Sequence, residues 1–136
     1  MTNVLIVDDH YSFSEMLELV LRPALSDKTG TPGRSPRFVY AATVADALQR
    51  FSEEGPFDLV VVDLILPDRG GTEVVREIKA QSPGTPVAVV SASEDLSEAL
   101  AEGADEAIPK DTGFAEIVAS LARLAGVPYR SSPQGS

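Results

Sequence analysis

The chain has 136 residues, one histidine, no cysteine and a formal charge of −10. This length fits one domain that buries most of its unfolded surface. The absence of cysteine excludes disulfides and thiolate metal sites. The acidic balance argues against contact of this segment with nucleic acid or with an anionic membrane.

The membrane-associated classes are also disfavoured. No apolar run approaches the roughly 20 residues that a transmembrane helix needs. Residues 1–3 are polar and lack the basic region of a secretion signal. We therefore expect a cytoplasmic location and no membrane partner.

The first half of the chain alternates between strand and helix patterns. Residues 4–7 form a short aliphatic run that predicts a buried strand, and apolar residues then recur at helical spacing over residues 10–25. Residues 26–36 hold two prolines and two glycines and no aliphatic residue, which predicts a flexible surface loop. A second strand over 37–42 precedes a helix that runs from the N-cap Thr43 to residue 54.

The second half continues the alternation. We expect strands at residues 59–62, 85–90 and 107–109, and helices that end near residues 81, 102 and 124. The predicted N-caps of these helices are Thr72, Ser93 and either Asp111 or Thr112. Residues 126–136 are polar and rich in Pro, Gly and Ser, which indicates a loose tail or the stub of a linker.

Five strands and five helices in alternation predict an α/β fold, a doubly wound parallel sheet with right-handed crossovers. The domain is expected to cover residues 1–125. Following precedent for such sheets, we choose the flavodoxin-like strand order 2-1-3-4-5. This order makes the first and third strands neighbours, so it places Asp8 and Asp9 beside Asp63.

The predicted strands end in residues of different chemical types, namely Asp8-Asp9, Asp63, Ser91 and Lys110. The carboxyl ends of parallel strands meet at one edge of the sheet, where ligands bind. Crowded carboxylates repel one another unless a divalent cation neutralises them, and Mg²⁺ prefers such oxygen ligands. Lys110 and Ser91 could then hold phosphoryl oxygens, so the edge suits phosphoryl chemistry.

In this order and on these strands, the motifs resemble a receiver domain of two-component response regulators over residues 3–125. The resemblance rests on Asp8-Asp9, Asp63-x-x-x-Pro67-x-x-x-Gly71, Ser91-Ala92, Gly103-Ala104 and Lys110. It implies that Asp63 accepts a phosphoryl group from a sensor histidine kinase or a phosphotransfer protein. It also implies that Asp9, Asp63 and the backbone carbonyl of Ile65 bind Mg²⁺, while Asp8 acts through a water molecule.

The resemblance further implies that Ser91, Ala92 and Lys110 form the phosphoryl-binding switch. The chain would then be a phosphoacceptor with self-dephosphorylation and not an enzyme, and a homodimer is compatible with this class. The segments Val-Asp-Asp-His10 and Ile-Pro-Lys110 resemble receivers of LuxR/NarL-type transcription regulators in particular. For His10, a partly exposed residue that opens the first helix is favoured over a phosphate carrier.

One departure from the receiver pattern keeps a second function open. Receivers usually place an aromatic switch residue three positions before the lysine, where this chain has Ala107. The alternative is therefore an atypical receiver that acts as a phosphorylation-independent interaction module. A phosphatase that uses Asp63 as its nucleophile is disfavoured, because Ile65 occupies the position of the general acid in an Asp-x-Asp pair.

Overall fold

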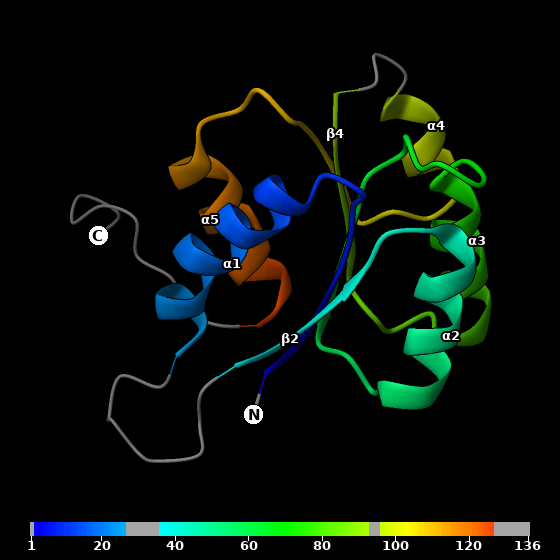
Figure 1. The fold of residues 1–136 in the computed structure, drawn as a ribbon, viewed down its shortest axis with the longest axis horizontal. Coiled ribbons are helices and arrows are strands. Elements are labelled where there is room, and N and C mark those ends of the chain that lie inside the picture. Colours follow the sequence, from blue (N-terminus) through cyan, green and yellow to red (C-terminus); the bar gives the residue numbers. More distant parts are fainter. Residues whose placement is uncertain (1, 27–35, 93–95, 127–136) are drawn as a thin grey trace.

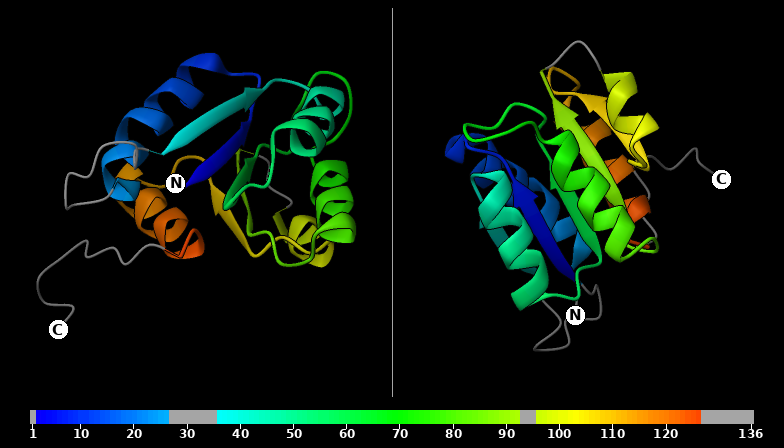
Figure 2. Two further views of the ribbon diagram at one scale, coloured as in Figure 1. Left: turned by 90° about the horizontal axis from the view of Figure 1, so that it is seen from below. Right: turned by 90° about the vertical axis from the view of Figure 1, so that its right-hand side faces the viewer.

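The computed structural model describes residues 2–26, 36–92 and 96–126. It shows one parallel sheet in the order β2-β1-β3-β4-β5, with helices on both faces (Figures 1 and 2). The strands are β1 (Asn3–Val7), β2 (Arg37–Ala41), β3 (Leu59–Val62), β4 (Val87–Ser91) and β5 (Glu106–Pro109). The helices are α1 (Tyr11–Leu25), α2 (Val44–Glu54), α3 (Thr72–Gln81), α4 (Leu96–Ala101) and α5 (Phe114–Leu124). The predicted fold class and strand order are confirmed.

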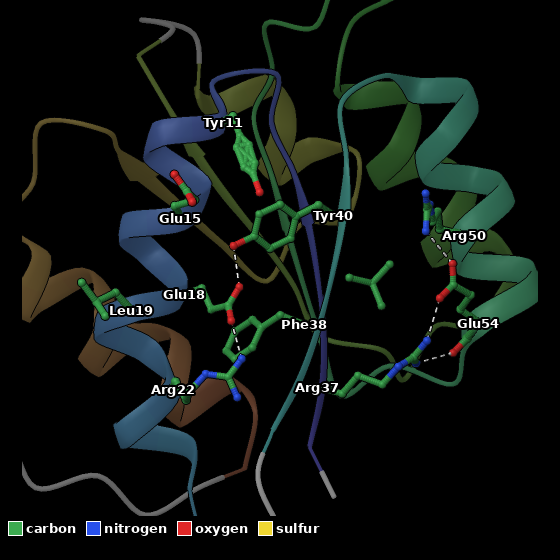
Figure 3. Close-up of a pocket in the computed structure, with 11 residues that line it drawn as sticks. Tyr11, Glu15, Glu18, Leu19, Arg22, Arg37, Phe38, Tyr40, Arg50 and Glu54 are labelled. Atoms are coloured by element: carbon green, nitrogen blue, oxygen red, sulfur yellow. Dashed lines mark hydrogen bonds and ion pairs between the residues drawn. The ribbon is translucent and has the colours of Figure 1, made fainter.

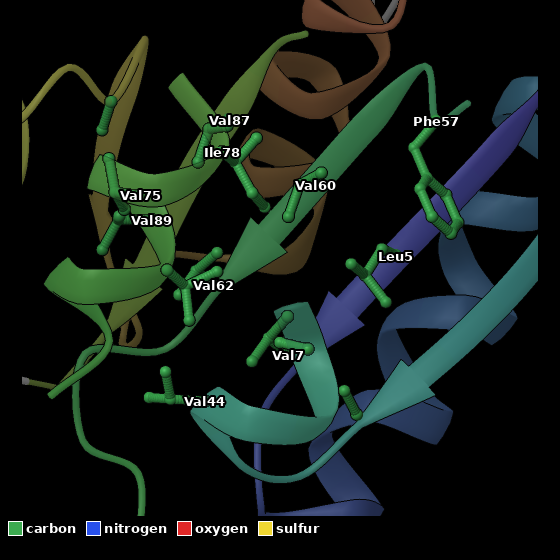
Figure 4. Packing of buried hydrophobic residues seen from close by; sticks show 14 of the residues in the cluster. Leu5, Val7, Val44, Phe57, Val60, Val62, Val75, Ile78, Val87 and Val89 are labelled. Atoms are coloured by element: carbon green, nitrogen blue, oxygen red, sulfur yellow. The ribbon is translucent and has the colours of Figure 1, made fainter. Parts of the chain in front are cut away.

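The sheet separates two hydrophobic layers. Helices α1 and α5 cover one face, while α2, α3 and α4 cover the other (Figure 1). Successive residues of a strand point to opposite faces, so Val60 and Val62 pack toward α2 and α3 (Figure 4), whereas Leu59 and Val61 pack toward α1 and α5. Burial on both faces explains why these strands read as unbroken apolar runs.

The register of the sheet aligns the ends of the strands that carry polar residues. Val7 of β1 is paired with Val62 of β3, and the amide of Asp63 donates to the carbonyl of Val7 at 2.8 Å. At the other side, the amide of Lys110 donates to the carbonyl of Ser91 at 2.9 Å. Backbone pairing therefore holds the polar residues after β1, β3 and β5 at one edge.

The N-cap of α2 was predicted correctly. The hydroxyl of Thr43 accepts from the amide of Asp46 at 3.0 Å. The carboxylate of Asp68, in the loop after β3, accepts from the first two amides of the same helix, those of Val44 at 2.9 Å and Ala45 at 3.1 Å. These bonds lower the pKa of the exposed Asp68 carboxyl group, and they join the loop to the start of α2.

The predicted N-caps of α3 and α5 were wrong. Thr72 is the first residue of α3, and Gly71 occupies the N-cap position, with its carbonyl accepting from the amide of Val74 at 3.0 Å. Gly113, and not Asp111 or Thr112, precedes α5, and neither glycine can supply a side-chain bond. Both helices begin where the chain leaves a tight turn, so backbone geometry decides the start.

Three expectations fall wholly or partly outside the described residues. These are the loop over 27–35, the cap Ser93 with the first residues of the predicted fourth helix, and the tail from 127. Within the described part, α4 begins at Leu96 and ends at Ala101. None of the helices that the structure describes is long and apolar enough to cross a membrane.

Candidate phosphoryl-acceptor site

Asp63 lies at the carboxyl end of β3, and its side chain is only 2% exposed. Its oxygen Oδ1 accepts from the hydroxyl of Ser91 at 2.7 Å and from the amide of Ile65 at 3.2 Å. The other oxygen, Oδ2, accepts from Nζ of Lys110 at 3.2 Å. The carboxylate is therefore oriented by donors from three different segments of the chain.

The acidic pair after β1 lies beside Asp63. The side chain of Asp8 is 3% exposed, and its Oδ2 is 2.8 Å from Nζ of Lys110. Its Oδ1 accepts from the amide of His10 at 2.8 Å. Asp9 is more open, with 37% of its side chain exposed. Four side chains meet here, and each offers one atom that could bind a metal ion. These four atoms, from Asp8, Asp9, His10 and Asp63, all lie within 4.8 Å of one another.

Lys110 is the cation that offsets these carboxylates. Burial opposes its charged form, but hydrogen bonding and attraction from Asp8, and then from Asp63, outweigh that effect and raise the pKa of the ammonium group. Its Nζ also lies 4.4 Å from the centroid of the Phe13 ring, a cation–π distance. Phe13 in turn packs against Phe114 of α5 at 5.8 Å between ring centroids.

The loop between β3 and α3 returns close to the acceptor strand at Gly71. The amide of Gly71 donates to the carbonyl of Leu64 at 2.9 Å. A Cβ atom at Gly71 would lie 2.1 Å from the carbonyl oxygen of Asp63, which no side chain can tolerate. Glycine is therefore required here by close backbone approach, and its φ of −64° is ordinary.

The comparisons with known proteins agree with this arrangement. Residues 4–122 match the family described as the response regulator receiver domain. This chain belongs to that family. The KDP operon transcriptional regulatory protein KdpE of Escherichia coli is 35% identical over 124 residues, which cover 89% of the chain and 50% of KdpE. The response regulator protein PilR of Pseudomonas aeruginosa is 35% identical over 95% of the chain and 28% of its own length.

Solved receivers share the fold. Response regulator TrrA of Thermotoga maritima, in complex with Mg²⁺-BeF, has a TM-score of 0.73 and 27% identity, covering 91% of this chain and 99% of its own. The BeF₃-activated receiver domain of DrrB has a TM-score of 0.76 and 26% identity, covering 93% and 98%. This receiver spans half or less of the length of KdpE and PilR.

The relatives do not single out the LuxR/NarL subgroup. They include KdpE, RegX3 and MtrA, which are regulators of the OmpR/PhoB type. The expected subgroup rested on two short segments, one of four residues that ends at His10 and one of three residues that ends at Lys110. The chain is therefore assigned to the receiver family and not to the LuxR/NarL subgroup.

The structure brings together most of the residues that the sequence singled out. Asp8, Asp9, Asp63, Ser91 and Lys110 form one cluster at the carboxyl edge of the sheet. Two further predicted positions adjoin the cluster along the chain: Ile65 lies two residues after the acceptor and is exposed, and Ala92 follows Ser91 and is exposed. Ala107 lies inside β5 opposite Val89 and packs against the hydrophobic layer under α2, α3 and α4.

Two neighbours of the cluster, His10 and Phe13, were not predicted as site residues. His10 was interpreted as a partly exposed residue that opens the first helix, and it is the N-cap of α1 with 61% of its side chain exposed. The ring nitrogen Nδ1 of His10 is 3.1 Å from Asp8 and 3.4 Å from both Asp9 and Lys110. The signal for a role of His10 at the cluster is its position directly after the acidic pair. Phe13 lies one helical turn further, a spacing that also fits an ordinary core position.

Replacing Lys110 by methionine should destabilise this receiver when no divalent cation is present. The change replaces the cation–π contact with Phe13 by an uncharged side chain and leaves Asp8 and Asp63 buried without a counter-charge. Because the Lys110 side chain is 15% exposed, we expect a loss of roughly 2 kcal/mol in the free energy of unfolding, below the value for fully buried pairs. Urea unfolding in EDTA measures it.

The control for this prediction is the double variant Lys110→Met with Asp8→Asn. Removing one negative charge from the cluster should restore most of the lost stability, and Mg²⁺ should do the same for the single variant. Equal stability of Lys110→Met and the parent protein in EDTA would show that the lysine does not offset the carboxylates.

A separate hollow of about 660 Å³ lies over β2, between α1 and α2 (Figure 3). The arginine side chains that line this hollow form ion pairs with glutamates that line it. Arg22 binds Glu18, while Arg37 and Arg50 both bind Glu54. The hydroxyl of Tyr40 donates to Glu18, and burial followed by this hydrogen bond raises the pKa of the phenol. These pairings join α1, β2 and α2 to one another.

Proposed function

We propose that this receiver accepts a phosphoryl group on Asp63 from a phosphohistidine of a sensor histidine kinase or a phosphotransfer protein. A carboxylate oxygen of Asp63 would attack phosphorus, and the bond from phosphorus to the histidine nitrogen would break with its electron pair leaving on nitrogen. The product is an acyl phosphate. The observation that carries this proposal is the buried Asp63 carboxylate, held between Lys110 and Ser91 at the open edge of the sheet.

Two side chains are placed to receive the added charge. Lys110 bonds Oδ2 of Asp63 and would pair with a phosphoryl oxygen through its ammonium group. Ser91 bonds Oδ1, and its hydroxyl could donate to a second phosphoryl oxygen. Ala92 follows directly, and its backbone would move with Ser91. We propose these three residues as the phosphoryl-binding switch.

Mg²⁺ is the cation that we propose for the acidic cluster. The donor set fits, since three carboxylates converge there and Mg²⁺ takes oxygen ligands. Asp9, Asp63 and the backbone carbonyl of Ile65 would hold it directly, and Asp8 through a water molecule. When bound, the cation neutralises the carboxylates and the incoming phosphoryl oxygens. The solved TrrA receiver, a complex with Mg²⁺-BeF, supports this choice.

The role of the whole protein follows from its relatives by analogy. KdpE is a transcriptional regulatory protein, and this receiver covers about half of it. We propose that the receiver is the N-terminal part of a longer cytoplasmic protein and regulates transcription through the rest of that protein. The receiver itself would make no contact with nucleic acid. It would hydrolyse its own acyl phosphate but would not act as an enzyme on other substrates. Homodimer formation is a further proposal of this kind.

A second candidate function is supported by Ala107. This residue lies in β5, at the position where receivers resembling this one carry an aromatic switch, and it has no ring to move. A receiver without that switch could work by constitutive protein binding. The complete cluster of Asp8, Asp63 and Lys110 favours the first proposal, in which Asp63 accepts a phosphoryl group, over constitutive binding.

Phosphorylation is tested by incubating the chain with Mg²⁺ and a small phosphodonor and then measuring the intact mass. We expect a gain of one phosphoryl group that EDTA prevents and that hydroxylamine removes, since hydroxylamine cleaves acyl phosphates. No mass gain under these conditions, in a folded protein, would favour the interaction module.

A further inference from the structure

His10 extends the carboxylate cluster with a nitrogen. It is the only histidine of the chain, and it follows the acidic pair at the N-cap of α1. Its ring nitrogen Nδ1 is 3.1 Å from Oδ1 of Asp8, 3.4 Å from Oδ1 of Asp9 and 3.8 Å from Oδ2 of Asp63. One edge of the ring therefore faces all three carboxylates, although 61% of the side chain is exposed.

These spacings suit the ligands of a single cation. For metal–ligand bonds of about 2.1 Å in an octahedron, adjacent ligands lie roughly 3 Å apart and opposite ones roughly 4.2 Å. The distances from Nδ1 to the two carboxylates that would bind the cation directly, 3.4 Å to Asp9 and 3.8 Å to Asp63, fall between those values. The backbone restrains the residue as well, because the His10 amide donates to Asp8 at 2.8 Å.

We infer that Nδ1 of His10 is a direct ligand of a divalent cation bound by Asp9 and Asp63. The cation that such a mixed site favours is a first-row transition metal ion, since imidazole suits these metals while Mg²⁺ prefers oxygen. Lys110 lies 3.4 Å from Nδ1 and 2.8 Å from Asp8, so the cation and the lysine compete for the same groups. This inference rests on the proposed function in one respect only, namely that the cation binds at Asp9 and Asp63.

The ordinary alternative is that the ring only fills the space beside Asp8 and turns out to solvent when a cation enters. The two cases differ in what His10→Gln does to different metals. A lost nitrogen ligand weakens Co²⁺ binding strongly and Mg²⁺ binding much less. If the ring only fills space, the substitution leaves Co²⁺ binding unchanged or strengthens the binding of both Co²⁺ and Mg²⁺.

The test is a titration of the untagged chain with Co²⁺ and, separately, with Mg²⁺, in the parent and in His10→Gln. We expect the variant to bind Co²⁺ at least about tenfold more weakly, with a much smaller change for Mg²⁺. An equal change for the two metals, or no weakening for Co²⁺, overturns the inference.

Proton NMR of the Co²⁺ complex supplies a readout that depends on bonding. An imidazole bound through Nδ1 keeps its Nε2 proton, which Co²⁺ shifts strongly and which exchanges with water. Labelling with [¹⁵N]histidine identifies this proton, since the chain has one histidine. We expect the signal in the parent and not in His10→Gln, and its absence from the parent overturns the inference.

Failure of this inference can be told apart from failure of the proposed function. Phosphoryl labelling of the parent chain with Mg²⁺ reports on Asp63. If labelling succeeds while the shifted ring proton is missing, only the role of His10 is wrong. If labelling fails while the ring proton is present, the metal site stands without the phosphoryl acceptor.

Discussion

Asp63→Asn is expected to reduce phosphoryl labelling by a small phosphodonor to background. The amide has the size of the carboxylate and can still accept from Ser91 and Ile65, so the fold should persist. What it lacks is the negative charge that makes a carboxylate oxygen a nucleophile. The variant loses the hydrogen bond from Lys110 to Oδ2 of Asp63. It also removes one charge from the crowded cluster with Asp8 and Asp9, which offsets that loss, so its stability should stay close to that of the parent.

The matched control is Asp58→Asn at the other end of the same strand. Asp58 precedes β3 and its carboxylate accepts from the amide of Asn3 at 2.8 Å, away from the carboxyl edge. Labelling should continue in this variant. A hydroxylamine-sensitive phosphoryl group that persists in Asp63→Asn would mean that another carboxylate is the acceptor.

Gly71→Ala should be the most destabilising single-methyl change in the loop after β3. The added Cβ would lie 2.1 Å from the carbonyl oxygen of Asp63 and 2.8 Å from Cα of Leu64, both backbone atoms that cannot rotate away. We expect a loss of about 2 to 4 kcal/mol in the free energy of unfolding. Because the clash is with the acceptor residue itself, labelling of Asp63 should also slow.

Gly70→Ala provides the control one residue away. A Cβ there would meet only the hydroxyl of Thr72, at 3.7 Å, in an exposed position. Its effect on stability should stay within about 0.5 kcal/mol. Urea unfolding followed by circular dichroism compares the two variants, and similar losses in both would show that loop flexibility, and not close approach, sets the cost.

The sequence by itself determined the fold class and most of the cluster, whereas the strand order was taken from precedent. Runs such as residues 59–62 are short, apolar at every position and rich in β-branched residues, a combination that favours a strand buried on both faces. Each run stops at a charged or hydroxyl residue, and parallel pairing then gathers those residues at one edge whatever the loops do. Local spacing also located the cap Thr43, because its hydroxyl bonds an amide three residues away.

Tertiary structure decided the features that depend on contacts between distant segments. Asp68 caps α2 from 23 and 24 residues away, and Lys110 reaches the Phe13 ring across the edge of the sheet. The orientation of His10 toward three carboxylates depends on how α1 leaves β1. Only the packed chain shows that Gly71 touches the backbone of Asp63, because the pattern of residues along a segment does not record the distance between two segments.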